Sequence, residues 1–322
     1  MERSKVYFRA DADTTIGYGH FIRTLALADM LKEDFDCVFF TQTPTEYQIH
    51  EASEVCRLES LPADETRFDL FLERLRGDEI VVLDNYFYTT EYQQAIKAKG
   101  CRLVCIDDMH DRHYVADVVV NHGIDKASLL DVEPYTRLCL GLEWALLRRP
   151  FLEAAKRGPS HRNDRMEKVA VCFGGSDAMD FTGRFAVRLT QIPSVREIIA
   201  VTGDGYRPKE PMEQDSRVHY RSRLSAEEMA EVFTQADAVF CSASSVCMEA
   251  LACGAKVAAG WYVDNQRGFY EMMKAHGWIY PLEKLPGEYS ENLPELTDFV
   301  FGMATGLFSG IGMHYVSLFK TL

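Results

Sequence analysis

The chain has 322 residues, 47% of them hydrophobic, so it can build one or two globular cores, and two domains are the better expectation. Its formal net charge of −14 argues against a nucleic-acid-binding protein, which would need a concentrated basic face to neutralise phosphates. We therefore expect no nucleic-acid partner, and an anionic ligand would have to be held by local donors.

The cysteines and the two ends of the chain suggest a cellular compartment. The nine cysteines form no C-x-x-C pair and several fall in predicted strands, so we expect reduced core thiols and a cytoplasmic location. The start of the chain has no apolar run long enough for a signal peptide. Residues 299–319 carry no Asp, Glu, Lys or Arg, but their glycines favour a docked C-terminal helix over stable membrane insertion. A membrane-associated segment is the alternative.

Short apolar runs alternate with helical patterns along the first half of the chain. This rhythm is typical of βαβ units, and runs that are apolar throughout are typical of parallel strands buried on both faces. The pattern predicts an N-terminal Rossmann-like α/β domain over residues 1–150. The apolar runs begin at Val6, Cys37, Ile80, Arg102 and Val118.

A charged segment that contains Pro150, Gly158 and Pro159 interrupts this rhythm, and we expect a linker over residues 151–165. The alternation then restarts and predicts a C-terminal nucleotide-binding Rossmann-like domain over residues 166–300. Two such domains that face each other would form a cleft, with ligands beyond the carboxyl ends of the strands. The second set of apolar runs begins at Val169, Glu197, Ala238 and Lys256.

The loop after the first strand reads R-A-D-A-D-T-T-I-G-Y-G-H and leads into a helical pattern at His20. Gly17 and Gly19 would let the backbone turn sharply and approach a ligand. At a helix N-terminus the dipole disfavours imidazolium, and a neutral imidazole can take a proton from water. We expect Asp11 or Asp13 to hold the other ring nitrogen, and Asp11 to contact the substrate. Taken alone, the motif is also typical of a surface histidine.

Two further loops of the first half carry polar side chains. After the strand at Ile80 comes D-N-Y-F-Y, in which Tyr86 would line a sugar pocket or pack between the domains. The loop at 107–113 combines aspartates and histidines in a spacing that matches no zinc signature. We expect a solvated polar loop there, and no metal site.

Two strand ends of the second half are suited to phosphates. Gly174 and Gly175 form a small-residue turn that can bring backbone amides to a phosphate. The segment F-C-S-A-S-S-V-C-M-E-A-L ends a strand and opens a helix, so that Ser242, Ser244 and Ser245 can grip a diphosphate.

Two other polar positions of the second half suit the remaining parts of a nucleotide sugar. Glu249, one turn into the helix that the serines open, can bind ribose hydroxyls, and a solvent-facing Glu is the alternative. After the strand at Lys256, the amides of Asn265 and Gln266 suit sugar hydroxyl or acetamido groups.

A resemblance to a known family is carried by four segments: R-A-D-A-D-T-T-I-G-Y-G-H, D-N-Y, S-A-S-S-V-C-M-E-A-L and V-D-N-Q. In order and spacing they resemble the UDP-sugar hydrolases of pseudaminic acid biosynthesis, relatives of the GT-B glycosyltransferases, over almost the whole chain. The resemblance implies two Rossmann-like domains facing a cleft. It also implies cleavage of UDP from UDP-2,4-diacetamido-2,4,6-trideoxy-β-L-altrose, with inversion and without metal or other cofactor.

The resemblance assigns roles to individual residues. It makes His20 the base, Tyr86 part of the substrate pocket, Glu249 a nucleotide contact and Asn265 a substrate contact. Asn85 departs from the family, which commonly has His there, so substrate preference could differ. The tail beyond Asn292 is longer than in compact members, and we expect residues 301–322 to form a helix that crosses back to the N-terminal domain.

Catalysis would follow from charge. The departing UDP would be stabilised by the serine loop, the glycine turn and their helix N-termini, while His20 takes a proton from water on the opposite face of the sugar. Three alternatives stay open: a glycosyltransferase that uses a UDP-amino sugar, a non-catalytic nucleotide-sugar-binding protein, and an epimerase. Other enzymes of the same pathway are possible partners.

Overall fold

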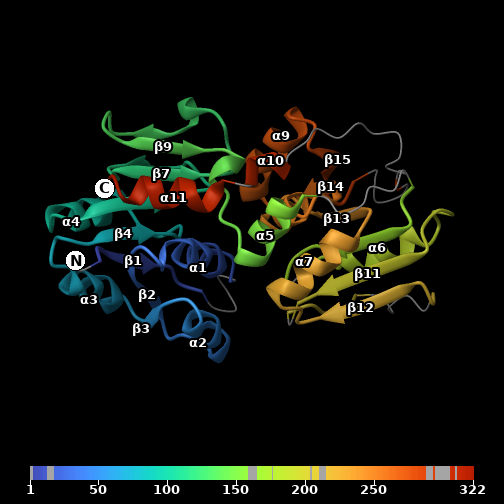
Figure 1. Cartoon of the computed structure of the whole chain (residues 1–322), viewed down its shortest axis with the longest axis horizontal. Coiled ribbons are helices and arrows are strands. Elements are labelled where there is room, and N and C mark those ends of the chain that lie inside the picture. Colours follow the sequence, from blue (N-terminus) through green and yellow to red (C-terminus); the bar gives the residue numbers. More distant parts are fainter. Residues whose placement is uncertain are drawn as a thin grey trace. The chain divides into compact units, whose positions relative to one another are not determined.

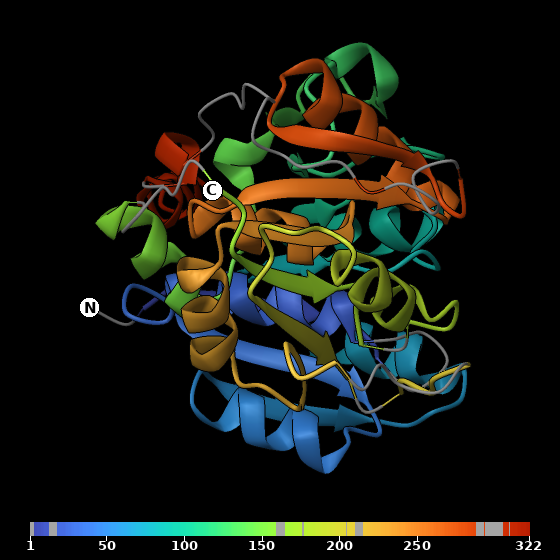
Figure 2. The same cartoon turned by 90° about the vertical axis from the view of Figure 1, so that its right-hand side faces the viewer.

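The computed structural model describes residues 3–12, 18–158, 165–175, 177–203, 205–209, 215–287, 293, 305–308 and 310–322. The chain forms two compact units. Unit 1 comprises Met1–Arg149 and Gly310–Leu322, and unit 2 comprises Pro150–Ser309. Each unit contains a parallel β-sheet flanked by helices, which confirms the predicted α/β class (Figures 1 and 2).

The sheet of unit 1 has seven parallel strands in the order β3-β2-β1-β4-β5-β7-β9. They are β1 (Lys5–Arg9), β2 (Asp36–Gln42), β3 (Arg57–Leu61), β4 (Ile80–Leu83), β5 (Arg102–Ile106), β7 (Val118–Asn121) and β9 (Arg137–Leu140). Strand β4 is buried along its whole length, as its uniformly apolar sequence predicts. Two shorter strands, β6 (His113–Tyr114) and β8 (Asp131–Val132), pair separately.

Strand order brings the loops after β1 and β4 together. Arg9 is paired with Leu83, and the backbone amide of Asp84 donates to the Arg9 carbonyl at 3.1 Å. The carboxyl ends of the two strands therefore lie side by side, although they are far apart in sequence. The helices of this unit are α1 (Gly19–Leu31), α2 (Glu46–Ser53), α3 (Thr66–Arg74), α4 (Thr90–Ala98) and α11 (Ile311–Phe319), with short 3₁₀ helices at Ala127–Leu129 and Leu142–Trp144.

Helix α11 completes the core of unit 1. Its Ile311, Tyr315, Leu318 and Phe319 are buried. Phe319 meets Phe35, which follows α1, with 6.1 Å between ring centroids, and the Tyr315 hydroxyl donates to the Trp144 carbonyl at 2.6 Å. None of the helices in the described ranges combines the length and the apolarity needed to cross a membrane.

The sheet of unit 2 has six parallel strands in the order β12-β11-β10-β13-β14-β15. They are β10 (Lys168–Cys172), β11 (Glu197–Thr202), β12 (Val218–Ser222), β13 (Ala238–Ser242), β14 (Lys256–Trp261) and β15 (Ile279–Lys284). The helices are α5 (Arg149–Arg157), α6 (Phe181–Leu189), α7 (Ala226–Gln235), α8 (Ser245–Ala252), α9 (Asp264–Ala275) and α10 (Thr305–Phe308).

The segment expected as a linker is partly helical. Residues 149–157 form α5, and Phe151 packs against Phe233 of α7 with 6.4 Å between ring centroids. Pro150 does not prevent the helix because proline is tolerated in the first helical turn, where its missing N–H would have no partner. The apolar face of α5, with Phe151, Leu152, Ala154 and Ala155 buried, explains why these residues are not an extended connection.

Candidate functional site

Asp84, at the end of β4, is the centre of a buried hydrogen-bond network. Its carboxylate is fully buried and lies 2.7 Å from His20 Nδ1. It also accepts from Arg23, through Nε at 2.6 Å and Nη2 at 2.5 Å, and from the Thr24 hydroxyl at 2.8 Å. Burial alone would raise the pKa of Asp84, but the charge of Arg23 outweighs it and holds that pKa well below the usual range. Asp84 is therefore ionised and can only accept.

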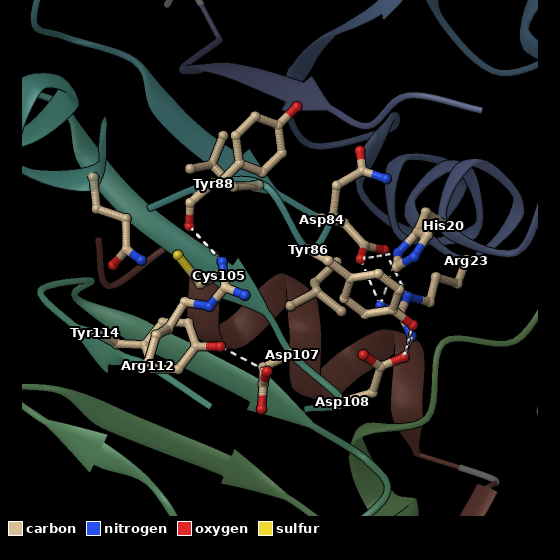
Figure 3. A pocket seen from close by; sticks show the side chains of 14 residues that line it. His20, Arg23, Asp84, Tyr86, Tyr88, Cys105, Asp107, Asp108, Arg112 and Tyr114 are labelled. Atoms are coloured by element: carbon tan, nitrogen blue, oxygen red, sulfur yellow. Dashed lines mark hydrogen bonds and ion pairs between the residues drawn. The ribbon is translucent and has the colours of Figure 1, made fainter. Parts of the chain in front are cut away.

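His20 is the second residue of α1, and its side chain is nearly buried. Within the described residues, two groups lie at Nδ1: the Asp84 carboxylate, which accepts, and Arg23 Nη2 at 3.1 Å, which can only donate. Because the Asp84 carboxylate must accept there, Nδ1 carries the hydrogen and Nε2 is the basic nitrogen of the neutral ring. The Tyr86 ring meets the imidazole edge-on, with 4.6 Å between centroids (Figure 3). This arrangement can take a proton from a water molecule at Nε2.

Arg23 joins two acidic side chains from different strand ends. In addition to Asp84, it donates through Nη1 to Asp108 Oδ2 at 2.9 Å. The Tyr86 hydroxyl donates to the same Asp108 oxygen at 3.1 Å. The positions of the histidine and of the tyrosine are thus fixed by one chain of charge-assisted hydrogen bonds. Figure 3 shows His20, Arg23, Tyr86 and Asp108 on one side of the pocket.

The expected pairing of Asp11 with His20 is wrong. The Asp11 carboxylate is fully buried and pairs with both terminal nitrogens of Arg9, one of them at 2.8 Å. It also accepts the backbone amide of Gln42 at 2.8 Å. These partners hold Asp11 toward the Arg9 side chain and the end of β2, so Asp84 takes the place at His20. The alternative, Asp13, lies outside the described residues, and a substrate contact by Asp11 stays a prediction.

The sequence predicts that two glycines, Gly17 and Gly19, shape the loop before His20. Gly17 lies outside the described residues. Gly19 is the first residue of α1, and a Cβ built there would meet no atom within 4 Å. Its backbone is not among the positive-φ glycines, so the conformation does not require glycine.

Asn85 connects the two loops of the site. Its Oδ1 accepts the backbone amide of Asp11 at 2.6 Å, and its Nδ2 donates to the Asp11 carbonyl at 3.2 Å. A side-chain amide can satisfy a backbone N–H and C=O at once because its donor and acceptor lie side by side. Asn85 therefore fixes the loop after β1 to the loop after β4.

The loop at 107–113 is not solvated throughout, contrary to expectation. Asp107 is buried, and its carboxylate accepts from the Tyr114 hydroxyl at 2.6 Å and from Asn121 Nδ2 at 2.9 Å. It also accepts the backbone amides of Met109 and His110. Asp107 is a structural acceptor that shapes the turn. In the described part of the chain, no group of three or more His, Cys, Asp or Glu side chains could hold a metal ion.

In unit 2, the turn after β10 differs from the expected phosphate cradle. Gly174 has a φ of 98°, which favours glycine. However, buried Asp177 accepts the first amides of α6, from Phe181 at 2.9 Å and Thr182 at 2.7 Å. Because this carboxylate already occupies the helix N-terminus, α6 cannot offer these amides to a phosphate. The first amides of α6 therefore differ from the expected anion site, and anion binding by the backbone of Gly174 and Gly175 stays a prediction.

The serine segment after β13 has no such cap among the described residues. Ser244 precedes α8 in an extended conformation and makes no side-chain cap. Ser242 is buried, and its hydroxyl lies 3.0 Å from that of Ser244, while Ser245 opens the helix. The N-terminus of α8 thus presents amides and hydroxyls of the kind that bind anions. Glu249 is only 5% exposed, so it is not the solvent-facing residue that was the alternative.

Asn265 and Gln266 lie in the first turn of α9, after β14. Asn265 is exposed. The Gln266 side-chain oxygen accepts the backbone amide of Tyr262 at 3.1 Å, so this oxygen already has a partner. A role of either amide in binding a sugar stays a prediction.

Sequence reasoning missed Arg23, Thr24 and the role of Asp84. The signal was present: Arg23 and Thr24 follow His20 by one helical turn, and Asp84 ends an apolar strand. In a parallel sheet with the common order 3-2-1-4, the ends of the first and fourth strands are neighbours, so an acidic residue at the second end faces the loop of the first.

Comparisons with known proteins give a consistent result. No family model matches the chain. It is 25% identical over 289 residues to the UDP-2,4-diacetamido-2,4,6-trideoxy-beta-L-altropyranose hydrolase of Campylobacter jejuni, covering 85% of this chain and 97% of that protein. The crystal structure of MurG from Acinetobacter baumannii matches with a TM-score of 0.63 at 13% identity, over 99% of this chain and 100% of the other.

A second solved structure, HepE from Anabaena in complex with UDP-glucose, matches with a TM-score of 0.60 at 11% identity, over 99% and 100% of the two chains. At such identities the structural likeness establishes the fold. The chain thus resembles the UDP-diacetamido-trideoxy-altropyranose hydrolase in sequence and has the GT-B fold of the glycosyltransferases.

Proposed function

We propose that the protein is an inverting hydrolase that releases UDP from a UDP-2,4-diacetamido-2,4,6-trideoxy sugar in the biosynthesis of pseudaminic or a related nonulosonic acid. The observation that carries the proposal is the buried contact of 2.7 Å between Asp84 and His20 Nδ1, which leaves Nε2 as the base. The likeness to the Campylobacter jejuni hydrolase over 85% of the chain supports the choice of substrate.

In the proposed reaction, His20 Nε2 removes a proton from a water molecule as the water oxygen attacks the anomeric carbon. The bond between this carbon and the UDP oxygen breaks, and its electron pair leaves with UDP. Asp84 holds the imidazole in the required tautomer and stabilises the imidazolium that forms. Arg23 keeps Asp84 ionised throughout. Attack on the face opposite to the leaving group inverts the anomeric configuration.

The nucleotide part is assigned to unit 2. Ser242, Ser244 and Ser245 with the open N-terminus of α8 bind the diphosphate and stabilise its developing charge, so the proposal involves no metal. Gly174 and Gly175 contribute backbone only, since Asp177 closes the adjacent helix. Glu249 binds the ribose, and Asn265 and Gln266 bind the sugar. Tyr86 lines the sugar pocket next to His20.

The test is product analysis by NMR with the purified protein and this UDP-sugar. Free UDP and a free sugar, first seen as the inverted anomer, are expected. In ¹⁸O-labelled water the label enters the sugar, because the bond from carbon to oxygen breaks. His20→Asn lowers kcat by ~100- to 10,000-fold, the range of general-base catalysis, while UDP binding persists. Full turnover by correctly folded His20→Asn would refute the role of His20.

A matched control is His50→Asn, because His50 is an exposed histidine on α2 of the same unit. Its turnover stays at the level of the unchanged protein.

A glycosyltransferase is the second candidate, since the fold is that of glycosyltransferases. It would be indicated by a new glycoside in the presence of an acceptor and by little free sugar in its absence. UDP binding without any product would indicate a binding protein, and UDP release with an altered stereocentre an epimerase.

A further inference from the structure

The pocket that contains His20 also includes side chains that the proposed reaction does not use. Gln93 of α4 and Arg112, which precedes β6, both line it. In Figure 3, Tyr86 is drawn between His20 on one side and the Arg112 guanidinium on the other, and Arg112 lies beside Cys105. This second part of the pocket, formed by Gln93 and Arg112, is called the amide subsite below.

In both residues of the amide subsite, some polar atoms of the side chain are hydrogen-bonded, while one nitrogen has no partner among the described residues. Arg112 donates through Nε to Asp111 at 2.9 Å and through Nη1 to the Tyr88 carbonyl at 2.8 Å. Its Nη2 has no partner among the described residues. Gln93 is 1% exposed, and its Oε1 accepts the Val115 amide at 3.1 Å. Its Nε2 is buried without a partner in the described part of the chain.

A buried N–H group without a partner costs about 1–3 kcal/mol, so a ligand that accepts from it gains affinity. The pocket therefore offers two N–H₂ groups, carried by separate elements, to an oxygen atom. Each is already oriented, because other atoms of the same guanidinium or amide group are hydrogen-bonded. Pre-orientation lowers the entropy that binding would otherwise cost.

Three acceptors beside the amide subsite already have donors, and this restricts the chemistry of the ligand. Asp107 accepts four hydrogen-bond donors, the Tyr88 carbonyl accepts Arg112, and Gln93 Oε1 accepts the Val115 amide. Two buried oxygens of the pocket have no partner among the described residues: the Tyr88 hydroxyl, which points away from Arg112, and Asp108 Oδ1, which lies on the His20 side (Figure 3). A ligand hydroxyl would bring a hydrogen that finds no acceptor beside these donors. A carbonyl oxygen needs only donors.

Charge favours a neutral carbonyl over a carboxylate. The single positive charge of Arg112 is paired with Asp111, and the Asp107 carboxylate also lines the pocket. The local charge is therefore not positive, and a second anion would be repelled.

From these observations, we propose that the amide subsite binds the carbonyl oxygen of an acylamino substituent on the sugar, with Gln93 Nε2 and Arg112 Nη2 as the donors. The inference rests on the proposed function, in which the substrate carries two acetamido groups, and it assigns one of them to this part of unit 1. Gln93 and Arg112 are then specificity-determining residues.

The decisive variant is Gln93→Glu, which keeps an oxygen for the Val115 amide but replaces the donor with an acceptor. With the UDP-diacetamido sugar, KM rises about tenfold, the value of one lost hydrogen bond to a buried group, while kcat stays within about threefold. The Kd for UDP alone is unchanged. Gln94→Glu is the matched control, since Gln94 is the exposed neighbour on the same helix, and its KM is that of the unchanged protein.

A second measurement does not depend on turnover or on folding of the variant. N-methylacetamide is titrated at millimolar concentrations into ¹⁵N-labelled unchanged protein, and the side-chain amide signal of Gln93 shifts, whereas that of Gln94 does not. An unmoved Gln93 signal overturns the subsite, as does an unchanged KM in folded Gln93→Glu. If the unchanged protein fails to cleave UDP-sugars, the proposed function is refuted, and the N-methylacetamide titration alone decides on the subsite.

Discussion

Replacing Asp84 with asparagine tests the centre of the site. The carboxylate receives four hydrogen bonds: from His20, twice from Arg23 and from Thr24. An amide keeps one accepting oxygen, and its NH₂ must face one pair of donors. Arg23 Nη2 lies 3.1 Å from His20 Nδ1, so the favoured arrangement turns Nδ1 into an acceptor for Arg23 and for the new NH₂. The hydrogen then moves to Nε2, and the base is lost.

The magnitudes follow from this rearrangement. A histidine in the wrong tautomer costs about 10,000-fold in kcat in enzymes that use a carboxylate-histidine pair. Removing one partner of a buried ion pair costs about 3–5 kcal/mol of stability. Arg23 keeps Asp108 at 2.9 Å, so the lower end, about 3 kcal/mol, is expected. Since the pKa of Asp84 is lowered in the folded protein, this difference is constant above about pH 4 and shrinks as the pH falls further.

The assay combines urea unfolding with a coupled measurement of UDP release. Asp78→Asn is the control, because Asp78 is exposed and precedes β4, the strand that Asp84 follows. This control changes neither quantity. The reasoning is refuted if Asp84→Asn folds and keeps kcat within about tenfold of the unchanged protein. It is also refuted if the stability loss above pH 5 is below about 1 kcal/mol.

Two further predictions concern buried groups. Burial, followed by the charge of Arg23, lowers the pKa of His122 to about 4. The unfolded chain therefore binds more protons between pH 6.5 and 4, and about 2 kcal/mol of stability is lost from pH 7 to 5, a slope that His122→Asn removes in urea unfolding. An equal slope in both proteins would contradict this. Asp177→Ala removes the cap of α6 and costs about 1–2 kcal/mol by the same assay, while the Kd for UDP, measured by calorimetry, stays unchanged. A large loss of UDP affinity in this variant would place the diphosphate at α6 instead of α8.

The parts of the site that depend on one segment could be predicted from sequence. The uniformly apolar run before Asp84 predicts a buried strand, and the pattern after His20 predicts a helix that starts there. Both are confirmed. The partner of His20 could not be predicted this way: Asp11 is nearer in sequence, but Asp84 contacts His20 in the structure. Contact across a sheet is set by strand order, and β1 lies beside β4.

The capping of α6 is a second case in which local composition was insufficient. Two glycines before a helix suggest a phosphate turn. Whether an aspartate caps the helix instead depends on the backbone angle φ of that aspartate. Asp177 adopts a φ of 34°, and its carboxylate turns back onto the amides of the helix that follows. Aspartate tolerates a positive φ better than most residues, but the sequence alone does not show which aspartate adopts it.

Helix α11 has a consequence for the order in which the protein is made. Unit 1 consists of residues from both ends of the chain. The ribosome therefore releases all of unit 2 before it releases the residues that pack against Phe35 and Trp144. Although domains nearer the N-terminus usually fold first during synthesis, the one that holds His20 can complete its core only after translation reaches residue 319.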